Sequence, residues 1–265
     1  MADELAVASC FQEDPGRHGH VIRSNCFPSP ASVQPVTLLQ FRYEEILRRF
    51  DRQLEDLQTR LLEMGGQVES ALHNSIGALV DRDEARARQV LASESHVDAL
   101  EIEIDDFAVR LMALHQPMAR DMRFLAATIK INNDLERMGD LAAHIAERAL
   151  SLMQQPPLPV LDIPRLAQLA EAMVHDSLDA LTRQDAELAQ RVLLSDDAVD
   201  RLRDGLYSDL IAFMQSDTAS LPSAVHLLFV VRHLERIADH ATNIGEDVLF
   251  YLRGVDVRHH ASLAG

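Results

Sequence analysis

The sequence predicts an all-α protein made of two tandem three-helix bundles that follow a disordered N-terminal extension. Three observations predict this fold: the composition, the spacing of apolar residues and an internal repeat. Ala, Leu, Glu, Arg and Gln, which favour helices, dominate the chain. Aromatic residues make up 5%, and 10 Gly and 10 Pro in 265 residues are too few for a turn-rich β fold.

Apolar residues recur at steps of three and four over three stretches of the first half, which is typical of helices in a bundle. These helices are expected at about 38–80, 84–114 and 117–154. Pro117 is expected at the first position of the third helix, where its missing N–H is not needed. The apolar stripe of that helix consists of Phe124, Thr128, Ile131, Leu135, Met138, Ala142, Ile145, Ala149 and Leu152.

A proline-rich segment at 154–164 interrupts the pattern and predicts a domain boundary. Three further helices are expected after it, at about 162–183, 185–215 and 220–253. The prolines and polar residues at the start of the chain show neither helical nor strand periodicity, which indicates disorder. The predicted domains are an extension at 1–37, a first bundle at 38–155, a second bundle at 156–256 and a tail at 257–265.

The two bundles are predicted to be copies of one unit, because segments of the first reappear in the second. In the last helix of each unit, Asp134-Leu135-Glu136-Arg137-Met138-Gly139-Asp140 corresponds to His233-Leu234-Glu235-Arg236-Ile237-Ala238-Asp239, at an offset of 99 residues. In the middle helices, Val97-Asp98 corresponds to Val199-Asp200 at an offset of 102.

Acidic residues spaced four apart occupy matching places on the second and third helix of each unit. The four pairs are Glu94/Asp98, Glu136/Asp140, Asp196/Asp200 and Glu235/Asp239. Residues four apart share a helix face, where two carboxylates repel each other and a cation would relieve the repulsion. Carboxylate oxygen suits Mg, Mn, Fe and Zn. A solvated acidic face copied by duplication explains the same pattern, so the residues alone leave both interpretations open.

The helical register places these carboxylates on the surface. If the apolar stripe of the third helix faces the core, Glu136, Asp140 and His144 project away from it. The inward Glu and Glu-x-x-His arrangement of di-iron bundles is therefore not expected. A metal ion would lie near the surface, in a groove between the second and third helices.

Composition and motifs disfavour several other classes of protein. The net charge of −17 opposes general binding to nucleic acid. No run of 18 apolar residues predicts a membrane span, and no apolar signal core is visible, so the cytoplasm is the expected compartment. Cys10 and Cys26 do not form a disulfide framework. The sequence shows no phosphate-binding loop and no nucleophile with a partnering base, so an enzyme is not expected.

These residues resemble the PhoU family of phosphate-uptake regulators over about 40–255. The doubled L-E-R-[MI]-[GA]-D pattern is the most specific part of the resemblance. The matching segments are Leu61-Leu62-x-Met64-Gly65, Gln116-Pro117-x-Ala119-x-Asp121-Met122-Arg123, Leu135-Glu136-Arg137-Met138-Gly139-Asp140 and Leu234-Glu235-Arg236-Ile237-Ala238-Asp239-x-x-x-Asn243-Ile244.

The resemblance implies a function as well as a PhoU-like fold. PhoU-like proteins are not enzymes but negative regulators of the phosphate-starvation response. They are thought to couple the ATPase subunit of the phosphate ABC transporter to a membrane histidine kinase, and they often form homodimers. The resemblance also implies multinuclear metal sites, which fall here on the four acidic pairs; the metal could be Fe, Zn, Mn or Mg.

The chain departs from the family pattern at a few positions. His144 stands where Asn is common, Ala238 replaces a usual Gly, and the second unit lacks the Gln-Pro-x-Ala-x-Asp segment. These departures predict that the two sites differ in metal affinity. Two alternatives remain beside the regulator: a metal-binding or metal-storage bundle protein, and a structural adaptor that holds no metal.

Overall fold

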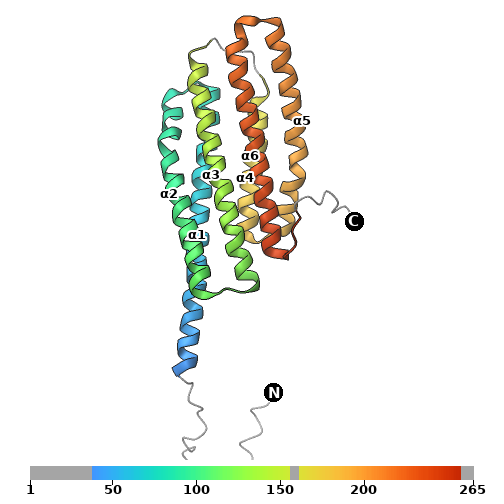
Figure 1. The fold of residues 1–265 in the computed structure, drawn as a ribbon. Coiled ribbons are helices and arrows are strands. Elements are labelled where there is room, and N and C mark those ends of the chain that lie inside the picture. The colour runs from blue at the N-terminus through green and yellow to red at the C-terminus, as the bar shows by residue number, and fades with distance from the viewer. Residues whose placement is uncertain (1–37, 156–160, 258–265) are drawn as a thin grey trace, which may run out of the picture. The chain divides into compact units, whose positions relative to one another are not determined.

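The computed structural model describes residues 38–155 and 161–257, and in these ranges all regular structure is helical, with no strand. The predicted disordered extension at 1–37 and the tail after Val257 lie outside the described residues. The elements are α1 (Leu38–Asp81), α2 (Glu84–His115), α3 (Ala119–Met153), α4 (Ile163–Arg183), α5 (Ala186–Ser216), a short 3₁₀ helix (Thr218–Ser220) and α6 (Leu221–Arg253) (Figure 1).

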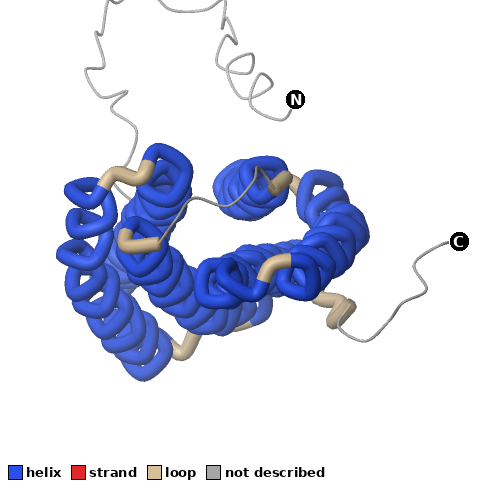
Figure 2. The backbone as a smooth tube through the Cα atoms, turned by 90° about the horizontal axis from the view of Figure 1, so that it is seen from above, coloured by secondary structure: helices blue, strands red, loops and turns tan. Residues whose placement is uncertain are grey.

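The chain divides into two compact units, Met1–Glu45 and Ile46–Gly265. The whole helical arrangement from Ile46 onward belongs to the second unit. The predicted boundary at 155–156 therefore falls between two sets of three helices within this unit. Within it, α3 packs against both α2 and α6, and α6 packs against α3, α4 and α5. The helices lie side by side, with α3 and α6 in contact where the two sets meet (Figures 1 and 2).

Short polar links begin the middle helix of each set in the same way. Asp83 precedes α2 and accepts a hydrogen bond from the backbone N–H of Arg86. Asp185 precedes α5 and accepts from the backbone N–H groups of Glu187 and Leu188. An aspartate in this position satisfies helix N–H groups that have no partner within the helix. The middle helix of each set is thus capped in the same way.

The start of α3 differs from the prediction. Pro117 does not begin the helix, because Gln116 adopts a left-handed conformation (φ 48°) that ends α2 and Met118 is extended (φ −124°, ψ 156°). The helix therefore starts at Ala119, and Pro117 lies buried in the link. The prediction erred because a proline that is acceptable at a helix start is equally acceptable in a link.

The core consists of the predicted apolar stripes. All nine predicted stripe residues of α3 are buried, from Phe124 to Leu152. Leu135 and its equivalent Leu234 on α6 are both fully buried. Burial of such side chains stabilises the fold by about 2 kcal/mol each. The stripe leaves the opposite faces of α2, α3, α5 and α6 to the polar residues of the candidate site.

Two glycines permit close approach of neighbouring helices. A Cβ on Gly65 of α1 would meet a side-chain methyl of Leu178 on α4 at 2.8 Å, so the missing side chain admits α4. A Cβ on Gly139 of α3 would lie 3.2 Å from Val97 of α2. The second contact places α2 and α3 close together beside the acidic residues on their surfaces.

Candidate functional site

The first candidate site is a group of carboxylates on neighbouring faces of α2 and α3. We define the first patch as Glu94, Asp98 and Glu101 of α2 with Glu136 and Asp140 of α3. Burial raises the pKa of the Glu94 carboxyl, and the carboxylates of Asp140 and Asp98 raise it further. Burial likewise raises the pKa of Glu136, with Asp140, Glu101 and Asp98 adding to the effect and Arg137 opposing it. The two predicted pairs therefore lie within electrostatic reach of each other.

The first patch faces outward, as the helical register indicated. Glu94 and Asp98 are exposed, while Glu101, Glu136 and Asp140 are partly buried. Arg137 approaches Glu136, with 3.5 Å between its Nε and Oε2, but its side chain is 54% exposed. Such an exposed pair contributes at most about 1 kcal/mol. The excess of negative charge in the first patch is thus only weakly compensated by this neighbour.

The second candidate site is the equivalent group on α5 and α6. We define the second patch as Asp196, Asp200 and Arg203 of α5 with Glu235 and Asp239 of α6. Burial raises the pKa of Asp196, and Asp200 adds to the effect, while a hydrogen bond from Thr242 opposes it. Burial, followed by the carboxylates of Glu235 and Asp196, raises the pKa of Asp239 to about 6. The predicted pairs of the second unit are thus also brought together.

Arg203, which belongs to none of the predicted acidic pairs, bridges the two helices of the second patch. Its Nη1 lies 2.6 Å from Asp200 Oδ1 and 2.8 Å from Glu235 Oε1. Its Nε and Nη2 donate to Asp204 Oδ1, at 3.0 and 2.9 Å. The offset of 102 residues places Glu101 at the corresponding position of the first patch. A comparison of the two middle helices could have revealed this reversal of charge.

The carboxylates suit a metal ion by their chemistry more than by their present arrangement. Oxygen donors on two adjacent helices are what hard and borderline cations accept. Among the described residues, however, no three His, Cys, Asp or Glu side chains are already gathered as ligands around one point. The donor set of the first patch therefore fits a cation only after its exposed carboxylates change rotamer.

The patches border the contact between α3 and α6. Beside the first patch, the rings of His144 and His233 stack with centroids 5.4 Å apart, and both ring nitrogens of His233 are buried without a hydrogen-bond partner. Burial, followed by the neighbouring His144 and Arg148, lowers the pKa of His233 to about 4. Beside the second patch, Asp134 Oδ1 instead accepts hydrogen bonds from His240 Nδ1 at 2.7 Å and Asn243 at 3.3 Å.

A polar cavity of about 410 Å³ opens next to the second patch. It is lined by Asp196, Arg236, Asp239, His240, Thr242 and Asn243. Two carboxylates of the second patch therefore face an open, solvated space. Their oxygens are accessible to a small cation or to a side chain of a partner.

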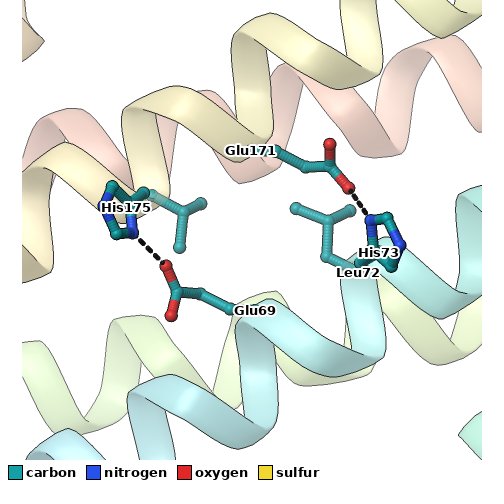
Figure 3. Close-up of a pocket in the computed structure, with 6 residues that line it drawn as sticks. Glu69, Leu72, His73, Glu171 and His175 are labelled. Atoms are coloured by element: carbon teal, nitrogen blue, oxygen red, sulfur yellow. Dashed lines mark hydrogen bonds and ion pairs between the residues drawn. The ribbon is translucent and has the colours of Figure 1, made fainter.

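A smaller cavity of about 200 Å³ lies between α1 and α4, away from both patches. Glu69 and His73 of α1 pair with His175 and Glu171 of α4 in a reciprocal way (Figure 3). The oxygen–nitrogen distances are 2.9 Å for Glu69–His175 and 3.2 Å for Glu171–His73. Leu72 and Val174 line the cavity together with these four residues (Figure 3). The four residues obey the 102-residue offset, so the repeat carries over to this contact.

The fold and the patches together define a class: an all-helical protein of two tandem repeats, each bearing a surface patch of paired carboxylates. The PhoU domain family matches the chain twice, at residues 61–149 and 163–248. The chain therefore belongs to the PhoU family. Among the described residues, no helix combines the length and apolarity that a membrane span needs.

Relatives named as PhoU proteins align with most of the chain. The phosphate-specific transport system accessory protein PhoU homolog of Pseudomonas aeruginosa is 37% identical over 81% of this chain and 89% of its own length. The homolog of Caulobacter vibrioides is 38% identical over 81% and 94%. The crystal structure of PhoU from P. aeruginosa superposes with a TM-score of 0.76 at 36% identity, over 78% of this chain and 100% of that one. The phosphate transport system regulatory protein PhoU from Streptococcus pneumoniae gives 0.74 at 28% identity, over 78% and 99%.

Proposed function

We propose that this protein is a negative regulator of the phosphate regulon and a modulator of phosphate uptake. The observation that carries the proposal is the family match in both repeats, together with relatives named as accessory or regulatory proteins of phosphate transport. The protein would signal phosphate sufficiency and keep the starvation genes off. It would act by docking to other proteins and not as an enzyme.

The proposed partners are the ATPase subunit of the phosphate ABC transporter and a phosphate-sensing histidine kinase. Long helices packed side by side offer extended, rigid surfaces, and the net charge of −17 favours basic faces on the partners. We place this action in the cytoplasm, where both partners expose their soluble domains, and we propose a homodimer as the working form.

We further propose that the carboxylates bind divalent or transition metal ions such as Fe, Zn, Mn or Mg. The gathering of carboxylates on α2 and α3 supports this proposal, because burial raises the pKa of both Glu94 and Glu136 and the carboxylates of Asp140 and Asp98 raise both values further. A metal ion would supply positive charge and tie α2 to α3. The residues that would hold it in the first patch are Glu94, Asp98, Glu136 and Asp140.

Deletion of the gene tests the regulatory role. Alkaline phosphatase activity in phosphate-rich medium should rise in the deletion strain and return to the repressed level when the wild-type gene is restored. Unchanged repression in the deletion strain would rule the proposal out.

Complementation with E136Q/D140N then separates the metal from the scaffold. Loss of repression by a variant that remains folded supports a metal-dependent regulator. Full repression favours an adaptor that holds no metal. If the purified protein binds metal but deletion of the gene leaves phosphate control unchanged, the two results together would instead favour a metal-storage protein.

A further inference from the structure

The two patches have the same scaffold but opposite charges at one equivalent position. Position 203 of the second patch is an arginine, and its repeat equivalent in the first patch is Glu101. Arg203 lies three residues after Asp200 on α5, which places both side chains on one face of the helix. From there the guanidinium reaches Glu235 on α6. The side chains of Arg203 and Glu235 are only 20% and 21% exposed.

The guanidinium occupies the place that a bridging metal ion would need. A metal ion that linked α5 to α6 would bind Asp200 and Glu235, and the nearest oxygens of both residues already accept hydrogen bonds from Nη1 of Arg203. Charge-assisted hydrogen bonds of this kind are among the strongest in proteins, and arginine stays charged at all relevant pH values. A metal ion could enter only by displacing a positive charge that is part of the chain.

The first patch has no equivalent group among the described residues. Glu101 adds a carboxylate where the second patch has a cation, and it helps to raise the pKa of Glu136. Arg137 does not compensate for this difference, because its repeat equivalent in the second unit is also an arginine, Arg236. At this place one repeat thus carries a positive side chain where the other carries a negative one.

We infer that Arg203 is the resident cation of the second patch, and that an added metal ion bridges two helices only at the first patch. This inference rests on the proposed metal binding for its second half, whereas the role of Arg203 stands on the ion pairs alone. The chain therefore carries one patch whose two helices a metal ion could bridge and one whose bridging carboxylates, Asp200 and Glu235, are already paired with a cation of the chain. The asymmetry lies in the residues of this chain and not in the shared fold.

The test uses the purified full-length chain with Mn²⁺ as the probe. Thermal unfolding is followed in EDTA and after addition of Mn²⁺, and tightly bound Mn²⁺ is measured by elemental analysis. R203Q removes the resident cation but keeps a polar side chain. R201Q is the matched control, because Arg201 is an exposed arginine two residues away on the same helix.

R203Q should lower Tm by about 4 °C in EDTA, because the remaining carboxylates repel each other. Mn²⁺ should restore Tm, and the bound Mn²⁺ should roughly double relative to the wild type, because the second patch becomes available. R201Q should leave both quantities at the wild-type values. If R203Q behaves like R201Q in both measurements, the inference is overturned.

Reciprocal variants identify the patch that binds Mn²⁺ in the wild type. E136Q/D140N and E101R should each abolish binding, while E235Q/D239N and the control E101Q should retain it. Loss of Mn²⁺ in E235Q/D239N with retention in E136Q/D140N would overturn the inference. A wild type that binds no Mn²⁺ would refute the proposed metal role of the first patch. The fall in Tm of R203Q in EDTA would then still decide whether Arg203 is the resident cation.

Discussion

The first and second patches show how a duplicated unit can keep its architecture and change its chemistry. The buried positions are equivalent: Leu135 and Leu234 are both fully buried in the last helix of their repeat. On the middle helix of each repeat, at a partly exposed position, Glu101 and Arg203 carry opposite charges. Burial constrains the first kind of position through packing, whereas a partly exposed position can change sign without loss of the fold.

If the two repeats share one core architecture, equivalent substitutions in the two cores should destabilise the protein equally. These substitutions should have the largest effects on the free energy of unfolding. L135A and L234A should each lower the free energy of unfolding by about 3 kcal/mol, because each leaves a cavity in a fully buried layer. Urea unfolding followed by circular dichroism measures both. The surface variant E103Q, on exposed residue 103, serves as a control and should change the value by less than about 0.5 kcal/mol.

Costs that differ by several-fold between L135A and L234A would contradict the equivalence. Such a result would show that the repeats diverge in the core as well as in the patches. The special position of Arg203 would then be one difference among many.

The contact between α3 and α6 provides the next comparison. Lys130 Nζ lies 2.7 Å from the buried Asp247, while the equivalent pair in the other half is Phe229 with Arg148, a cation 5.0 Å from the ring centroid. K130M should cost about 2 kcal/mol, because it removes a positive partner from a buried carboxylate. R148M should cost less than about 1 kcal/mol, because Phe229 is partly exposed.

Urea unfolding of K130M and R148M at pH 7 measures both costs. It tests whether the ion pair of Lys130 contributes more to the contact between α3 and α6 than the cation–π pair of Arg148. Equal costs would contradict the distinction between an ionic and an aromatic half. A larger cost for R148M would reverse it.

The titration of Asp239 sharpens the comparison between the patches. Because the pKa of Asp239 is about 6 in the folded protein and about 3.8 in the unfolded chain, the folded state holds more protons between these values. The contribution of Asp239 to stability is therefore present below about pH 3.8 and is lost as the pH rises through 6. D239N should raise the free energy of unfolding at pH 7 by about 1 kcal/mol, after allowance for the exposure of this side chain.

Unfolding in EDTA at pH 4, 5, 6 and 7 measures this dependence. The stabilisation by D239N should appear between pH 4 and 7 and vanish at the acid end. D209N, a substitution of an exposed aspartate on α5, should show no such trend. If the effect of D239N on the free energy of unfolding did not change with pH, the pKa of Asp239 would not be raised in the folded protein.

Most of the fold could be predicted from the sequence, because the period of the apolar residues reports directly on helix faces. The stripe of α3 and the outward direction of Glu136 and Asp140 follow from that period alone. The start of α3 could not be predicted in the same way, because it depends on the left-handed conformation of Gln116. Local backbone geometry of this kind leaves little trace in hydrophobic spacing.

Contacts between side chains of different helices could not be predicted from the sequence. The bridge from Arg203 to Glu235 depends on the axial alignment of α5 against α6, which periodicity within each helix does not specify. The reciprocal pairs of Glu69 with His175 and Glu171 with His73 depend on how one repeat meets the other. Internal symmetry supplies part of the missing signal, because Arg203 aligns with Glu101, and Glu171 and His175 align with Glu69 and His73, at the offset of 102 residues.

These reciprocal pairs between α1 and α4 yield the smallest predicted effect. The hydrogen bond to Glu69 raises the pKa of His175, with Asp179 and Asp176 of α4 adding to the effect. The stabilisation from this pair is therefore full below the unfolded pKa of about 6.5 and is lost as the pH rises through the higher folded value. Since the His175 side chain is 66% exposed, the pair of Glu69 with His175 contributes less than about 1 kcal/mol to the free energy of unfolding at pH 6.

A double-mutant cycle of E69Q and H175Q should give a coupling free energy that is measurable at pH 6 and close to zero at pH 9. The equivalent cycle of E171Q and H73Q serves as the matched comparison. A coupling that persists unchanged at pH 9 would show that the two helices are held by packing around Leu72 and Val174 and not by the charged pair.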